Sequence, residues 1–140
     1  VLAKKPGDEG FSLVELVVVI AVLAILSAVA IPAFQGVQER AKTSAVKNGL
    51  TNGIKECIVK YGLDGEEEFD DSQAFKGNYT GYNIVKLEGD TCFAARATPT
   101  GGKTSGLPRF EIVYDNTTGI VEKECEWSEI GCDEGGDPPW

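Results

Sequence analysis

The sequence contains no histidine, and several other components of enzyme active sites are missing with it. Histidine supplies the general base in many catalytic pairs and is the commonest metal ligand. The 140 residues also contain no nucleophile motif, no glycine-rich phosphate loop and no cluster of metal ligands at the usual spacing. An enzyme is therefore the least expected class of protein, and we expect no cofactor and no resident metal.

Basic residues are also scarce relative to acidic residues. The chain holds 22 Asp and Glu against 13 Lys and Arg, a formal net charge of −9. Residues 124–140 alone contain six acids and no base. Because such a surface repels phosphate groups, we expect neither a direct nucleic-acid partner nor binding to anionic lipid.

The four cysteines form no C-x-x-C pair of the kind that binds zinc or carries thiol redox chemistry. An even number of cysteines fits disulfides formed in an oxidising compartment. The alternative is a cytosolic protein with four unpaired buried thiols. The positions are Cys57, Cys92, Cys125 and Cys132.

One long hydrophobic run lies near the N-terminus. Residues 16–34 are 19 in number, and only Ser27 and Pro32 among them are not apolar. A helix of that length rises about 28 Å, close to the roughly 30 Å hydrocarbon core of a bilayer. A cleaved signal peptide competes with a membrane helix, since Ala28 and Ala30 have the spacing of a cleavage site. The helical apolar pattern continues beyond this run, which favours a retained membrane helix.

A single carboxylate, Glu15, stands at the start of the run. With Ser12 it forms an S-x-x-E capping box, which satisfies free amide groups at a helix start. Such effects stabilise a helix by about 1 kcal/mol. An acid at the membrane centre costs about 2.5 to 3.5 kcal/mol on insertion scales. Capping explains why the acid is tolerated, but it does not explain why an acid is needed.

The N-terminal residues "KKPGDEG" followed by "FSLVELVVVIAVLAIL" resemble the precursor segment of type IV pilins and of the related pseudopilins of type II secretion. The resemblance rests on a glycine before a phenylalanine, a glutamate four residues later and an apolar run of membrane length. It implies a leader, residues 1–10, that a prepilin peptidase removes between Gly10 and Phe11 on the cytoplasmic side. It also implies N-methylation of Phe11.

The same resemblance divides the rest of the chain. Residues 11–36 would be a hydrophobic helix for membrane insertion and assembly, and residues 37–140 a globular head. Glu15 would pair with the new Phe11 amine of a neighbouring subunit, because an unpaired acid is costly in an apolar bundle. Pairing and capping can hold together. Pro32 also fits the family, and its missing N–H weakens the helix there, although it could be a bend without a role.

Beyond the apolar run, the pattern predicts an amphipathic helix to about Tyr61, with Gly62 as its C-terminal cap. Four strands are predicted after this helix. In the third, residues 108–115, Phe110, Ile112 and Tyr114 share a face. In the fourth, residues 120–127, Val121, Cys125 and Trp127 lie on one face and three glutamates lie on the other. "DNTTG" between these two strands predicts a hairpin turn. The predicted strands are residues 79–87, 91–97, 108–115 and 120–127.

The expected fold class is therefore α+β. A long N-terminal helix, membrane-spanning in its first half and amphipathic in its second, packs on a small antiparallel sheet, in agreement with the pilin fold. Two acidic stretches invite a cation-binding interpretation, but the first lacks the glycine and the final acid of an EF-hand loop, and solvated surface is favoured for both. The acids are Asp64, Glu66, Glu68 and Asp70 in the loop 63–78, and Asp133, Glu134 and Asp137 in the tail.

The four cysteines allow three pairings. A Cys57–Cys92 bond would join the helix to an early strand. A Cys125–Cys132 bond would close a small C-terminal loop like the one that bounds the variable surface of many pilins. Crossed pairings stay open, because strand order could bring those residues together.

The resemblance implies a structural protein, the major subunit of a type IV pilus-like filament. Its partners would be identical or related pilin subunits, the prepilin peptidase and the inner-membrane assembly machinery. We expect a bacterial inner-membrane precursor that becomes an extracellular filament for adhesion, motility, DNA uptake or secretion. The alternatives are a pseudopilin of type II secretion, or a minor pilin acting as an adhesin or DNA receptor. The first residue is not methionine, so further leader residues are expected upstream.

Overall fold

Residues 10–65, 68, 72–87, 89, 91–127, 130–132 and 140 are described by a computed structural model of the chain. The elements run in the order α1, β1, β2, η2, β3 and β4. The chain divides into two units, residues 1–37 and residues 38–140.

Helix α1 spans Leu13–Asp64, and Pro32 lies inside it without ending it. The helix continues three residues beyond the predicted end at Tyr61, so the prediction of Gly62 as the cap was wrong. The cap is Gly65, whose φ is +73° and whose N–H donates to the Tyr61 carbonyl at 3.0 Å. A glycine ends a helix where the backbone turns left-handed, and position 62 keeps a helical backbone.

The first unit buries almost nothing within itself. Every described residue from Gly10 to Val37 is exposed. An 18-residue window of α1 has a mean hydropathy of 2.9, which makes the helix long and apolar enough to cross a membrane. The hydroxyl of Ser27 donates to the Leu23 carbonyl at 2.7 Å, so this polar group is satisfied inside the helix.

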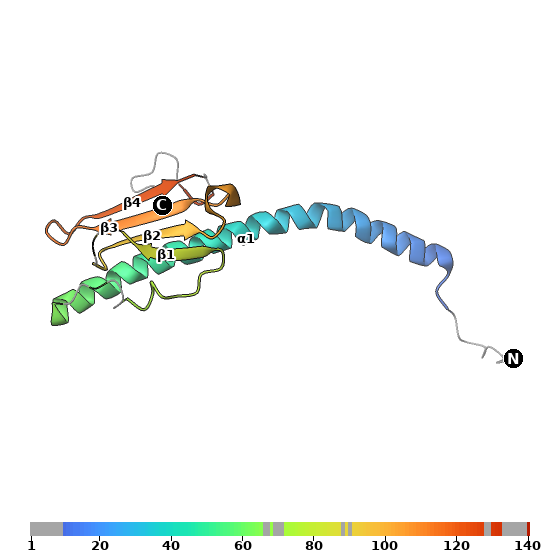
Figure 1. Ribbon diagram of the computed structural model, residues 1–140. Helices are drawn as coiled ribbons and strands as arrows, with labels where there is room; N and C mark the ends of the chain where they lie inside the picture. Colours follow the sequence, from blue (N-terminus) through green and yellow to red (C-terminus); the bar gives the residue numbers. More distant parts are fainter. Residues whose placement is uncertain are drawn as a thin grey trace. The chain divides into compact units, whose positions relative to one another are not determined.

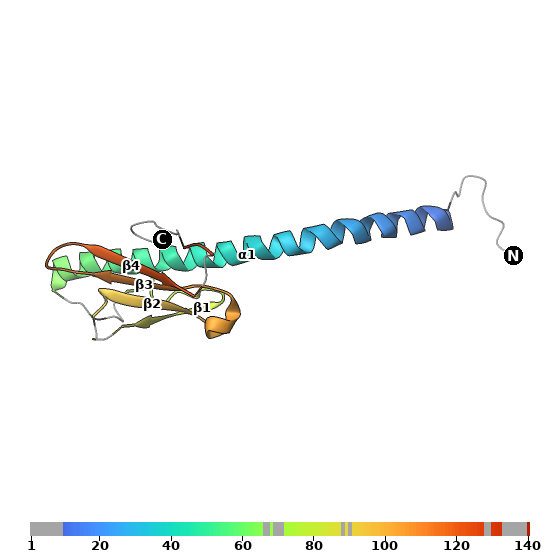
Figure 2. The ribbon, with the colours of Figure 1, turned by 90° about the horizontal axis from the view of Figure 1, so that it is seen from above.

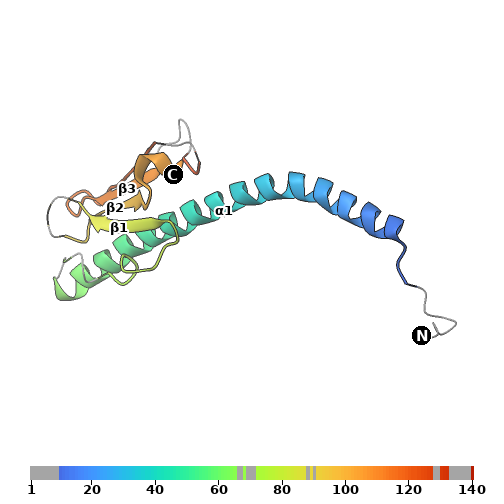
Figure 3. The same cartoon turned by 45° about the vertical axis from the view of Figure 1, so that its right-hand side comes forward.

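The second unit is a helix packed on a four-stranded antiparallel meander in the order β1-β2-β3-β4 (Figure 1). Figure 2 shows the sheet lying along one side of the C-terminal part of α1. The short helix η2, Gly102–Ser105, forms part of the connection between β2 and β3 (Figure 3). The strands are β1 Tyr82–Lys86, β2 Ala94–Pro99, β3 Arg109–Tyr114 and β4 Val121–Glu126. All four lie in or overlap the predicted segments, and the α+β class is confirmed.

The core lies between one stripe of α1 and the inner face of the sheet. The stripe repeats every three or four residues, as an amphipathic helix requires. Phe110 and Ile112 lie on the inner face of β3 and are 0% and 1% exposed, which confirms the predicted face of that strand. The other buried residues at this contact are Val46, Leu50, Ile54 and Cys57 of α1 and Ala95 and Ala97 of β2.

The predicted inner face of β4 was only partly right. Of its three residues, only Cys125 packs against the core. Val121 is 40% exposed. Trp127 follows the end of β4 with a φ of +81°, and its ring lies 4.8 Å from the Arg109 guanidinium. Strand alternation cannot place a residue whose backbone leaves the extended conformation.

The predicted hairpin between β3 and β4 is present and is closed by its own hydrogen bonds. The Asp115 carboxylate accepts the N–H groups of Thr117 at 2.8 Å and Thr118 at 3.3 Å. These bonds, led by that from Thr117, hold the pKa of Asp115 below its ordinary value. The Gly119 N–H donates to the Asp115 carbonyl at 2.7 Å, and Gly119 has a φ of +75°.

Both expected disulfides are present in the structure. Cys57–Cys92 joins α1 to the residues just before β2, and both residues are buried. Cys125–Cys132 closes the loop that follows β4. Loop closures of 35 and 7 residues correspond to about 4 and 2.5 kcal/mol of unfolded-state entropy. The Cys57–Cys92 bond therefore stabilises the fold more than the Cys125–Cys132 bond does.

Two aromatic rings from the segment before β1 pack directly against two glycines of α1. A Cβ at Gly49 would lie 2.2 Å from the Tyr79 hydroxyl, and a Cβ at Gly53 would lie 2.0 Å from the Phe75 ring. The Glu56 carboxylate fixes the same segment, since it accepts bonds from the Ser72 hydroxyl at 3.0 Å and from the Ala74 N–H at 2.9 Å. This segment is thus fitted directly against the helix backbone.

Trp140 covers the core at β3 and β4. Its ring centroid lies 5.4 Å from that of Phe110, and its indole N–H donates to the Glu124 carbonyl at 2.8 Å. The Lys123 ammonium lies 4.5 Å from the Trp140 ring centroid and donates to its carbonyl at 3.2 Å. Burial, with smaller contributions from Lys47 and Lys55, lowers the pKa of Lys123.

We predict that Gly53→Ala destabilises the head. The added methyl group overlaps the Phe75 ring, and overpacking of this kind costs about 1 to 3 kcal/mol. Gly62→Ala is the matched control, because a Cβ there meets nothing within 4 Å. It should stabilise the helix by about 0.5 to 1 kcal/mol. Thermal unfolding of the full chain in detergent, followed by near-ultraviolet circular dichroism, compares the two. Equal melting temperatures would contradict the close packing of Phe75 on Gly53.

Candidate assembly site

The start of α1 carries a complete capping box. The Glu15 carboxylate Oε2 accepts the Ser12 N–H at 2.8 Å, and the Glu15 N–H donates to the Ser12 hydroxyl at 3.2 Å. The Leu16 N–H donates to the Ser12 carbonyl at 3.2 Å and begins the helical ladder. The predicted capping geometry is therefore confirmed, and it satisfies amides that the first turn leaves without helical partners.

The capping bonds occupy only part of the carboxylate. Among the described residues, Oε1 of Glu15 has no hydrogen-bond partner. An ionised carboxylate accepts several bonds, so Glu15 can cap its own helix and bind a cation at the same time. The capping and pairing interpretations are chemically compatible.

Large apolar side chains surround this carboxylate and are exposed. Phe11 is 94% exposed and Leu13 is 79% exposed. Soluble monomers rarely expose apolar surface on this scale, and a membrane or other protein chains are what usually cover it. A carboxylate set in such surface offers a cation partner a site of low dielectric once the surface is covered.

The other predicted site residues lie elsewhere. Pro32 is seventeen residues beyond Glu15 on α1, a rise of about 26 Å. The four cysteines lie in the second unit, as two disulfides. Asp64 is the last residue of α1, and Glu68 forms an isolated bridge with Thr91. The remaining acids considered for cation binding lie outside the described residues: Glu66, Asp70, Asp133, Glu134 and Asp137.

Several residues that fix the head gave no clear sequence signal. Glu56 and Trp140 act through contacts with residues far away in the chain, 16 to 18 residues for Glu56 and 16 to 17 for Trp140. The Gly49 and Gly53 pair had a local signal, since two glycines four residues apart lie on one helix face. That spacing predicts close approach of another segment, but it does not identify the rings.

Comparison with known proteins assigns the family. Residues 6–31 match the family described as prokaryotic N-terminal methylation motif. The chain is 32% identical over 118 residues to the type IV major fimbrial protein FimA of Dichelobacter nodosus, covering 81% of this chain and 69% of FimA. It is 40% identical over 129 residues to the fimbrial protein EcpC of Eikenella corrodens, covering 86% and 84%.

The chain belongs to the type IV pilin family.

The alignment with a third pilin relative covers a smaller share of that relative's length. The type IV major pilin protein PilA of Myxococcus xanthus is 32% identical over 109 residues, 74% of this chain and 48% of PilA. All three relatives are named as pilins or fimbrial proteins, and none is named as an enzyme. No solved structure gives a significant match to this pilin.

We predict that Ser12→Ala frees the first turn of the pilin helix. The variant loses the hydroxyl that accepts the Glu15 N–H, and loss of such a cap costs about 1 kcal/mol. Hydrogen exchange of the Glu15 amide, measured by NMR in detergent micelles, should accelerate about fivefold. Ser27→Ala is the control, since its hydroxyl bonds only within the helix body and should leave that amide unchanged. Unaltered exchange in Ser12→Ala would show that the capping box does not protect this turn.

Proposed function

We propose that this pilin is the major subunit of a type IV pilus and that it polymerises through its hydrophobic N-terminal helix. The observation that carries the proposal is the placement of one carboxylate, Glu15, four residues after Phe11 and at the start of the apolar, exposed first part of α1. Residues 1–10 are the leader, residues 11–36 the membrane and assembly helix, and residues 37–140 the head that the filament displays.

In this proposal a prepilin peptidase cuts between Gly10 and Phe11, and the new Phe11 amine is methylated. The cut precedes the apolar run, so the mature chain keeps its membrane helix. It also creates a cation that the precursor lacks. Before assembly the subunit waits in the inner membrane, and the assembly machinery then moves it into an extracellular filament.

Glu15 then sets the register of the incoming subunit. Apolar side chains alone favour many alignments of two helices, because sliding changes their contacts little. A buried acid is costly in any alignment that leaves it unpaired. Pairing of the free Glu15 oxygen with the Phe11 amine of a neighbour removes that penalty in one alignment. Buried polar groups select register in coiled coils in the same way.

Pro32 has a separate role in this proposal. Its ring removes one hydrogen bond of the helical ladder and crowds the preceding turn. A Cβ at Gly36, four residues later, would meet nothing within 4 Å, so packing within the subunit does not require a glycine there, and the glycine adds backbone freedom. The stretch between them is where α1 can bend or unwind when subunits pack.

The processing step predicts a defined N-terminus. Mass spectrometry of filaments sheared from cells should give a chain that begins at Phe11 and carries one added methyl group on its amine. Cleavage before the apolar run, and not after it, distinguishes a pilin from a protein with an ordinary signal peptide. A mature chain that begins at or beyond Ile31 would overturn the proposal.

The register role predicts the behaviour of two Glu15 variants. Glu15→Leu raises the apolarity of the helix, so the protein should stay abundant in the membrane while filament yield falls at least tenfold. Glu15→Gln keeps the shape and removes the charge, and it should fail similarly. Ser12→Ala, which keeps the carboxylate, is the control and should still build filaments. Normal filament yield in both Glu15 variants would leave capping as the only role of this residue.

A further inference from the structure

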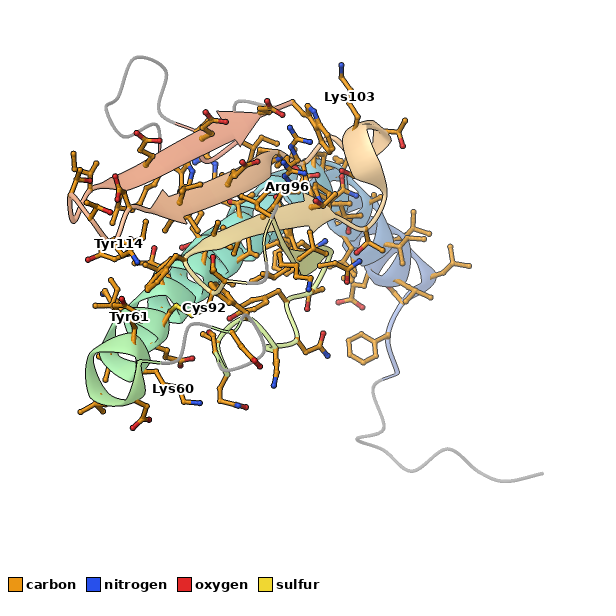
Figure 4. All side chains as sticks on the ribbon, turned by 60° about the vertical axis from the view of Figure 1, so that its left-hand side comes forward. Lys60, Tyr61, Cys92, Arg96, Lys103 and Tyr114 are labelled. Atoms are coloured by element: carbon orange, nitrogen blue, oxygen red, sulfur yellow. A yellow bond between two sulfur atoms is a disulfide. The ribbon has the colours of Figure 1, made fainter. Side chains whose placement is uncertain are left out.

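The head has two ends along the axis of α1, and different elements lie at each end. At one end α1 finishes beside the connection between β1 and β2 and the hairpin between β3 and β4. Figure 4 shows Tyr61 and Tyr114 at this end. The Tyr61 ring meets the Phe93 ring edge-on and the Tyr114 ring meets it at a tilt, with centroid distances of 5.4 and 5.5 Å. We call this the distal end. The proximal end holds the first turns of α1 in the head and the η2 connection, where Figure 4 shows Lys103.

The proximal end contains an open hollow with unused hydrogen-bond donors. It has a volume of about 540 Å³ and lies between α1 and the loop closed by Cys125–Cys132; Arg40, Ser44 and Lys47 line its helix side. Lys47 is already committed, since its ammonium donates to the Gly131 carbonyl at 2.9 Å. Within the described residues, the Arg40 guanidinium and the Ser44 hydroxyl have no partner. A guanidinium beside a hydroxyl is a set of donors suited to a carboxylate.

The distal end contains an acid in an unfavourable place. Asp64 is the last residue of α1, and the last turn contains no basic residue. The C-terminus of a helix carries partial negative charge, so a carboxylate there is repelled. Asp64 is exposed and has no ion-pair partner among the described residues. A cation from outside the subunit would relieve this repulsion.

Arg40 and Asp64 cannot meet within one chain. They are 24 residues apart on one helix, a separation of about 36 Å along its axis. The same count turns the helix by about 120° between them, so the two side chains leave it in different directions. The two groups therefore can pair only between different copies of the chain, and copies repeated head to tail bring the proximal end of one to the distal end of the next.

We propose that Arg40, together with Ser44, binds the Asp64 carboxylate of a second copy of this chain, placed about 36 Å further toward the membrane in the filament. This inference rests on the proposed function. The contact links heads that lie above one another, whereas Glu15 sets the register of the apolar helices. It opposes the repulsion between subunits that each carry a net charge of −9.

Charge reversal tests this contact. Arg40→Glu and Asp64→Lys should each reduce filament yield at least tenfold, because each places like charges opposite one another. The double variant should restore most of the yield. The controls make the same charge changes at the same ends of the head: Lys103→Glu at the exposed η2 helix and Glu122→Lys at the exposed start of β4. Both controls should assemble like the unaltered pilin.

A direct readout uses Arg40→Lys filaments treated with a zero-length carbodiimide. The new amine should form an amide with Asp64 of another copy, which peptide mapping identifies, and Asp64→Asn should abolish that product. Cross-linking to another acid, or yields of Arg40→Glu and Asp64→Lys equal to those of the controls, would overturn the contact while leaving the filament intact. Failure of the unaltered chain to form any filament would instead refute the proposed function.

Discussion

The head depends on the burial of one stripe of α1 by the inner face of the sheet. Val46 and Leu50 are fully buried on the helix side, and Phe110 is fully buried on the strand side. Burying side chains of this size stabilises a fold by about 1.5 to 3 kcal/mol each. Three other features stabilise the same contact between helix and sheet. The Cys57–Cys92 disulfide joins α1 to the residues just before β2, the Phe75 ring packs against Gly53, and the Trp140 ring packs against Phe110.

The two parts of α1 therefore suit different surroundings. In its second part α1 is amphipathic and satisfies its apolar stripe inside the subunit. In its first part it is apolar on all sides and finds no cover within the described chain. A helix of that composition is stable in lipid or in a bundle of similar helices, and both replace water around it. Under the proposed function, movement of the subunit from the membrane into the filament would exchange one apolar environment for the other.

The sequence predicts those features of this pilin that depend on neighbouring residues. The capping box of Ser12 and Glu15 and the inward face of Phe110 and Ile112 follow from spacing alone, and the structure confirms both. The end of α1 was misplaced by one turn because the choice between Gly62 and Gly65 depends on which glycine becomes left-handed. Trp127 was misplaced because a positive φ breaks the alternation of a strand.

The remaining contacts could not be predicted, for a different physical reason. Phe75 on Gly53, Glu56 on Ser72 and Trp140 on Phe110 join residues 16 to 30 positions apart. Nothing in local spacing selects these partners, because each pair is brought together only when the helix and the sheet dock. Docking in turn depends on the volume of every side chain in the core.

The hairpin between β3 and β4 has a practical consequence. Its hydrogen bonds close within residues 115–120, and the residues of its exposed tip, Asn116 to Gly119, form no hydrogen bond or ring contact with the described residues of the core. Changes at such a tip are tolerated, because they disturb neither buried side chains nor ladder bonds. Asn116 is therefore a suitable attachment point for a fluorescent dye or an epitope, with which assembly of the proposed filament could be followed under the microscope.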